Sequence, residues 1–134
     1  MTSFPLKIVT PDGLIFDGPA EKLIVRTTGG DVAILARHIN YVAALGMGRA
    51  VVEAGGNRRI AACIGGMLSV VDGEVTLVPT TFEWADSIDV DRAEASYQRA
   101  DKVLHDSSAT DTDVKLAEAR LHRALVRKSV ASYK

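Results

Sequence analysis

The chain has 134 residues, with 16 lysines and arginines against 17 aspartates and glutamates, so its formal net charge is −1. This balance lacks the basic excess of a nucleic-acid-binding domain, and no nucleic-acid partner is expected. The single cysteine, Cys63, excludes an internal disulfide and a thiolate metal cluster, and its apolar neighbours predict a buried thiol. No signal-like leader and no run of about eighteen apolar residues is apparent, so we expect a soluble protein in a reducing compartment.

The first part of the chain, residues 4–82, contains many short strand-like segments separated by glycine-rich turns. Two pairs, Gly55-Gly56 and Asp72-Gly73, stand between alternating segments and predict tight hairpins. The pair Gly65-Gly66 separates two further segments and is interpreted as a turn or a bulge, and Pro79 closes the run. Many short strands at close spacing predict an antiparallel β-sandwich or barrel.

The second part of the chain has the period of amphipathic helices. One apolar stripe is formed by Val90, Ala93, Tyr97, Ala100 and Leu104, and a second by Val114, Ala117, Leu121 and Leu125. Thr110 stands three residues before Asp113, which is the arrangement of a capping box. The segments predict an antiparallel helical hairpin in which Ala93 lies near Leu125 and Tyr97 near Leu121. The fold class is therefore α+β, with a β-sandwich over residues 1–84, a two-helix hairpin over residues 85–134, and a hinge candidate at residues 80–87.

Enzymatic chemistry is not indicated. His38 belongs to the predicted sandwich, whereas His105 and His122 belong to the hairpin, and no histidine pair has metal-ligand spacing. We therefore expect no catalytic residues, no metal site and no required cofactor. His38 by itself is interpreted as a turn or interface residue.

A cluster of charges flanks the helical stripes. Asp89 and Arg92 lie beside the first stripe, and Arg120, Arg123 and Arg127 form a line beside the second. One interpretation is a phosphate-recognition cluster in which guanidinium groups meet an anion. The other is structural, with Asp89 capping the first helix and the arginines forming a solvated flank. Spacing alone leaves both open.

The order of these pieces resembles the epsilon subunit of bacterial F-type ATP synthase over nearly the whole chain. The resemblance is carried by residues 4–13 with Phe16, Gly18 and Ala20, by Gly30, Asp31, Ile34, His38, Leu45, Gly48 and Val51, by residues 64–68, and by residues 75–77. It implies a ten-stranded sandwich bound to the gamma subunit and the c-ring, peripheral to the cytoplasmic face of the bacterial inner membrane. It also implies a non-catalytic rotor subunit whose helical pair folds down, or extends toward the catalytic beta subunits and inhibits ATP hydrolysis.

The resemblance also bears on single residues. In some bacterial members the folded hairpin binds ATP through an Ile-Asp-x-x-Arg-Ala motif, arginines of the second helix and an upstream acidic residue. The matching positions are Ile88, Asp89, Arg92, Ala93, Arg123, Arg127 and Glu83. ATP is thus expected as a regulatory ligand, and a free-standing adenine-nucleotide sensor of the same fold is the alternative.

The loop that carries Asp31 and His38 is the part of the family's sandwich that faces the c-ring, so both residues are candidates for partner binding. This sequence departs from the family there, with Ala33 in place of a frequent glycine and Ala36 and Asn40 in place of prolines. We therefore expect the turn around His38 to differ in shape from the family's.

Overall fold

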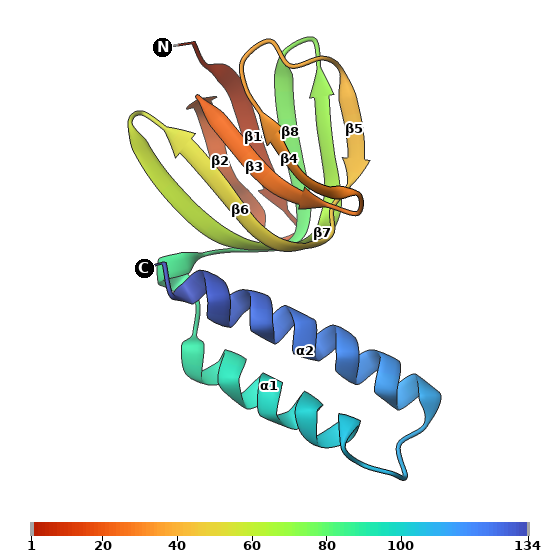
Figure 1. Ribbon diagram of the computed structural model, residues 1–134. Coiled ribbons are helices and arrows are strands. Elements are labelled where there is room, and N and C mark those ends of the chain that lie inside the picture. The colour runs from red at the N-terminus through yellow and green to blue at the C-terminus, as the bar shows by residue number, and fades with distance from the viewer. Residues whose placement is uncertain (1, 134) are drawn as a thin grey trace. The chain divides into compact units, whose positions relative to one another are not determined.

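The computed structural model describes residues 2–133 and divides into two compact units, Met1–Trp84 and Ala85–Lys134. The first unit consists of strands and the second of helices (Figure 1). The division coincides with the predicted domains.

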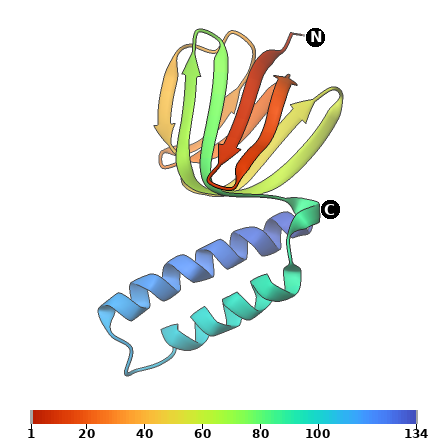
Figure 2. The ribbon, with the colours of Figure 1, turned by 180° about the vertical axis from the view of Figure 1, so that it is seen from behind.

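The first unit contains eight β-strands joined into one sheet. Their bounds are β1 Phe4–Thr10, β2 Gly13–Ala20, β3 Lys22–Thr27, β4 Gly30–Ile34, β5 Tyr41–Ala44, β6 Met47–Ala54, β7 Asn57–Val71 and β8 Glu74–Trp84. The sheet order is β2-β1-β8-β7-β6-β3-β4, and β5 pairs with β7. The pairing of β1 with β8 is parallel, and all other pairings are antiparallel. The views in Figures 1 and 2 agree that the sheet curves back on itself, with β3 and β4 lying over β1 and β8. The predicted sandwich is confirmed, with one parallel pair added.

Both predicted hairpin turns are present. Ala54 pairs with Asn57 around Gly55 and Gly56, whose φ values are 59° and 81°. Around the second turn, Asp72 and Gly73 have φ values of 50° and 81°. Two consecutive residues with positive φ define the type I′ turn, which matches the twist of the strands it joins.

The expected end of the strand run at Pro79 is wrong, and Gly65-Gly66, expected as a turn or bulge, forms no turn between strands. β7 and β8 run through these positions, and Gly66 pairs with Pro79. The core-facing residues of β7 are Ala61 and Cys63 before the glycines, and Leu68 and Val70 after them, so the inward face changes from odd to even positions. The pairing register of β7 with β8 is the same on both sides of the glycines, so these residues, with φ values of 67° and 109°, redirect a continuous strand instead of ending it. Because both strands are continuous, the described chain has eight strands where the family resemblance implies ten.

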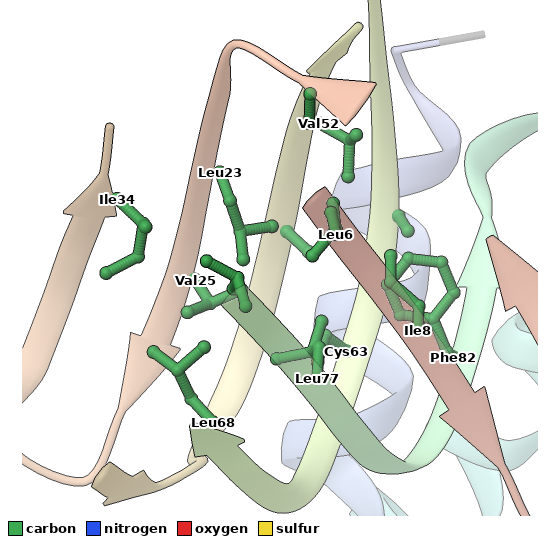
Figure 3. Close-up of a cluster of buried hydrophobic side chains, with 14 of the residues drawn as sticks. Leu6, Ile8, Leu23, Val25, Ile34, Val52, Cys63, Leu68, Leu77 and Phe82 are labelled. Atoms are coloured by element: carbon green, nitrogen blue, oxygen red, sulfur yellow. The ribbon is translucent and has the colours of Figure 1, made fainter. Parts of the chain in front are cut away.

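The core of the sandwich is formed by the inward faces of β1, β3, β4, β6, β7 and β8 (Figure 3). Its largest fully buried side chains include Leu6, Ile8, Leu23, Leu68 and Leu77. Cys63 also lies in this core, and burial raises the pKa of its thiol to about 12. The predicted buried thiol is confirmed.

The second unit begins with the 3₁₀ turn η1, Ala85–Ser87, followed by α1, Val90–Leu104, and α2, Asp111–Ala131. The Thr110 hydroxyl accepts from the Asp113 backbone N–H, and the Asp113 carboxylate accepts from the Thr110 N–H, so the predicted capping box is confirmed. The hinge candidate at residues 80–87 consists entirely of β8 and η1, so it has regular secondary structure. No helix in the described part of the chain is long and apolar enough to cross a lipid bilayer.

The two helices meet through small side chains. Ala93 and Ala100 are the buried residues of α1, and Ala117 and Ala124 are buried along α2. The predicted stripes are wrong at two residues, Val90 and Leu125, which are not buried but 43% and 44% exposed. Ala124 is buried in place of Leu125, because α2 is rotated so that its alanines face α1.

Candidate functional site

Asp89 is the N-cap of α1. Its Oδ1 accepts a hydrogen bond from the backbone N–H of Arg92 at 3.0 Å, and its backbone is extended at φ −81° and ψ 99°. A carboxylate at this position satisfies an otherwise unpaired amide and interacts favourably with the helix dipole. The structural interpretation of Asp89 is therefore confirmed. Its second carboxylate oxygen has no described role, so capping does not by itself exclude a ligand.

A groove with a volume of about 610 Å³ runs along the hairpin. Four arginines from both helices line it: Arg99, Arg120, Arg123 and Arg127. The last three recur on α2 at spacings of three and four, which places them on one face of the helix. The groove is therefore where the predicted arginine line meets the other helix.

The electrostatics of the groove favour an anion. Among residues 2–133, Arg120 and Arg123 form no ion pair, and Arg99 makes only a long contact of 3.4 Å to the Ser96 hydroxyl. At the loop end, Asp106 accepts hydrogen bonds from the side chain and backbone of Ser108, which hold its pKa below the usual value. Asp106 and Asp113 also line the groove, but neither forms an ion pair with Arg99, Arg120 or Arg123, so these three guanidinium groups suit a phosphate or carboxylate ligand.

The register of the hairpin differs from the predicted one by about one helical turn. Lys128 Nζ lies 2.6 Å from Glu94 Oε2 and 4.5 Å from the ring centroid of Tyr97, whereas the sequence predicts Leu121 opposite Tyr97. In this register Arg123 lies level with Arg99. Asp89 is ten residues before Arg99, so it lies about 15 Å away along the helix axis.

The predicted nucleotide residues are therefore only partly brought together. Arg123 and Arg127 share the groove, but Asp89 and Arg92 are absent from its lining. Glu83 lies on β8 in the first unit. Arg99 is a groove residue that the sequence reasoning missed, although it stands seven residues after Arg92, on the same helix face.

The two candidate partner residues of the sandwich have local contacts. Asp31 on β4 pairs with Arg26 on β3, with Arg26 Nη1 3.4 Å from Asp31 Oδ1. His38 follows β4, and its Nδ1 lies 2.8 Å from the carbonyl oxygen of Ile39. Because a carbonyl only accepts, this bond needs the proton on Nδ1. The His38 ring meets Tyr41 edge to face at a centroid distance of 5.8 Å.

The loop around His38 has two distinctive features, and one of them involves a departure from the family pattern. Arg37 has a φ of 66°, the left-handed region that a non-glycine residue rarely adopts. Asn40 Oδ1 accepts from the backbone N–H of Asp72 at 2.8 Å. This bond ties the loop to the β7–β8 turn, and a proline at position 40 has no side-chain acceptor with which to form it.

Metal chemistry receives no support from the side-chain arrangement. Across residues 2–133, no three histidine, cysteine, aspartate or glutamate side chains gather into a set able to hold a metal ion.

Comparison with known protein families decides the assignment of the chain. Residues 3–85 match the family model for the β-sandwich domain of the ATP synthase delta/epsilon chain, and residues 86–132 match that for its long α-helix domain. The chain belongs to the ATP synthase delta/epsilon family. The family's two domains thus account for both compact units.

Individual relatives agree with this membership. The chain is 42% identical to the ATP synthase epsilon chain of Ruminococcus albus over 100% of both chains. It is 40% identical to the epsilon chain of Bacillus velezensis over 98% of both. Among solved structures, a chain of the Euglena gracilis mitochondrial ATP synthase has the same fold, with a TM-score of 0.84 at 22% identity, covering 100% of this chain and 83% of that one.

Proposed function

We propose that this chain is the epsilon subunit of a bacterial F-type ATP synthase. In that role it is a non-catalytic subunit of the rotor's central stalk, peripheral to the cytoplasmic face of the inner membrane. The observation that carries the proposal is that both family domains match in order, and that bacterial epsilon chains align over the full length of this chain. A match to one domain would be compatible with a role in a different assembly, whereas a match over the whole length supports a role in the same assembly as the relatives.

The sandwich is the unit proposed to bind the gamma subunit and the c-ring. It has its own closed core, so its surface is held in place without help from the helices. Asp31 and His38 are the proposed contact residues on the ring side. Each already contacts a neighbouring group of the same unit: the Arg26 guanidinium for Asp31 and the Ile39 carbonyl for His38.

The first experiment measures association with gamma. Full-length chain and residues 1–84 are each expressed with a gamma subunit, and the complexes are isolated. We expect both to bind gamma, and the shorter chain to unfold in one cooperative transition. Asp31→Arg serves as the ring-side variant: it places two arginines side by side, so we expect weaker coupling to the c-ring with gamma binding retained. Failure of the full-length chain to bind gamma, or its isolation alone with bound nucleotide, would favour a free-standing sensor.

The hairpin is proposed to regulate ATP hydrolysis, with ATP as the ligand that holds it folded. Arg123 and Arg127 supply charge for the phosphates in the groove, and Arg92, Asp89 and Glu83 are the further candidates from the family motif. A ligand that bridges two helices binds only when they are closed, so it shifts the population toward the closed state by its differential affinity. No positioned base or metal set accompanies these arginines, so binding without turnover is expected.

The second experiment is a calorimetric titration of ATP into the wild type and Arg123→Ala. Loss of one charge-assisted contact, worth about 1.5 to 3 kcal/mol, should raise the dissociation constant about tenfold or more. Lys115→Ala is the matched control, because Lys115 is an exposed cation of α2 outside the groove lining. Equal affinity of Arg123→Ala and wild type would return the arginines to the role of a solvated basic face.

A further inference from the structure

The fully buried side chains along the seam between α1 and α2 are mostly alanines, and the larger apolar residues Tyr97, Leu104 and Leu121 are only half-buried. The buried residues on the facing sides include Ala93, Ala100, Ala117 and Ala124, each of which offers a single methyl group. Hydrophobic stabilisation grows with the apolar area removed from water. Closure of the hairpin therefore depends strongly on contacts at the edges of the seam.

One residue at that edge bridges the two helices by two different contacts. Lys128 of α2 places Nζ 2.6 Å from Glu94 Oε2 and 4.5 Å from the centroid of the Tyr97 ring, both on α1. Glu94 and Tyr97 are three residues apart, so they present neighbouring side chains on one helix face. A single cation thus meets a carboxylate and the negative face of an aromatic ring together.

The carboxylate of this cluster is oriented from its other side. Gln98 Nε2 donates to Glu94 Oε1 at 2.9 Å, so each oxygen of Glu94 has its own donor. The hydrogen bond from Lys128, followed by that from Gln98, holds the pKa of Glu94 below its usual value. The Lys128 side chain is 33% exposed, because its stem lies along the hairpin while its charge stays at the seam.

We propose that Lys128, Glu94 and Tyr97 form an electrostatic latch that favours the closed hairpin without any nucleotide and that is weakened by salt. The latch lies outside the arginine groove, since none of its three residues lines it. It therefore needs no anion bound there in order to form. Its regulatory consequence rests on the proposed function, in which the hairpin opens, whereas the latch itself is a property of the isolated chain.

The latch is tested on the isolated full-length chain without gamma and without nucleotide. Spin labels are attached at Ala95→Cys on α1 and His122→Cys on α2, both exposed positions outside the latch. The native Cys63 is buried with a raised pKa of about 12, so it reacts poorly with the label near neutral pH. Electron-spin distance measurements then report the ratio of open to closed hairpins.

Four chains are compared: the wild type, Lys128→Gln, Lys128→Arg and Lys115→Gln. We expect Lys128→Gln to raise the open-to-closed ratio about fivefold, since it removes both the ion pair and the cation–π contact. Lys128→Arg keeps both contacts and should resemble the wild type. Lys115→Gln removes an exposed cation from the same helix and should also resemble it. Equal distance distributions for Lys128→Gln and the wild type would overturn the proposal.

Salt supplies the second arm of the test. Raising the ionic strength to about 1 M shortens the screening length to about 3 Å, and this should open the wild type while leaving Lys128→Gln nearly unchanged. An equal response of both chains would overturn the latch. Glu94→Gln provides a second variant: combined with Lys128→Gln it should add little, because the pair is already broken. These measurements need no partner, so their failure leaves gamma binding, and with it the proposed function, untouched.

Discussion

The sandwich and the hairpin are held together by different kinds of contact. The sandwich buries large aliphatic side chains such as Leu6, Leu23 and Leu77 completely. The buried residues of the two helices are alanines apart from Val130, while Leu116 and Leu125 remain 50% and 44% exposed. Full burial of a leucine contributes about 1.5 to 3 kcal/mol, against about 0.8 kcal/mol for one methylene-sized group. The sandwich therefore gains more stability from buried apolar side chains than the hairpin does.

The largest expected effect lies in the sandwich, at Gly66. A Cβ added there would lie 2.1 Å from the carbonyl oxygen of Val78, and the residue has a φ of 109°. Gly66→Ala should therefore lower the free energy of unfolding by about 3 kcal/mol or more, because backbone must move and a strained φ must be adopted. Denaturant unfolding measures the change.

Gly18→Ala is the matched control for this prediction. Gly18 also lies in a strand, but an added Cβ meets nothing within 4 Å and its φ is not in the left-handed region. We expect a change of about 0.5 kcal/mol or less. Similar losses for Gly18→Ala and Gly66→Ala would mean that the close approach of β7 and β8 is not what constrains position 66.

A second prediction concerns the pH dependence of the sandwich through Cys63. Its pKa is raised in the folded state to about 12, so the folded chain keeps its thiol proton at pH values where an unfolded chain loses it. Below the unfolded pKa of about 8.5 the thiol has no effect on the pH dependence. Between there and about pH 12 the free energy of unfolding should fall by up to about 1.4 kcal/mol per pH unit.

The test compares unfolding of the wild type and Cys63→Ala at several alkaline pH values. The substitution itself lowers stability at all pH values by leaving a small cavity. The informative quantity is the slope: the difference between the two chains should narrow as the pH rises above about 9. A constant difference up to pH 11 would show that the thiol is not held protonated by burial.

The smallest expected effect is in the hairpin, at the cap of α1. Asp89→Ala removes the acceptor of the Arg92 N–H, which should destabilise the first turn of α1 by about 1 kcal/mol. Amide hydrogen exchange measured without nucleotide should show faster exchange in that turn. The control is Asp91→Ala, which removes a first-turn carboxylate that is not the cap and should cost only a few tenths of a kcal/mol. Faster exchange in both would point to the helix dipole instead of the cap.

Most of the architecture follows from local sequence. Paired residues that adopt positive φ mark the turns at Gly55-Gly56 and Asp72-Gly73, and these are set within four residues of chain. The cap at Asp89 and the capping box at Thr110 are equally local, since donor and acceptor lie three residues apart. The spacing of apolar residues distinguishes the strands from the helices. The boundary at residue 84 follows from that change of period.

The features that the sequence did not determine all depend on residues far apart in the chain. Locally, Gly65 and Gly66 indicate a turn or a bulge, but long-range pairing of β7 with β8 continues the strand through them. The register of the hairpin also depends on contacts between distant residues. One helix of an alanine-rich pair can shift by a helical turn along the other without losing much buried apolar area, so contacts such as that of Lys128 with Glu94 select one register. Because of this register, Arg99 and not Asp89 lines the groove together with Arg120 and Arg123.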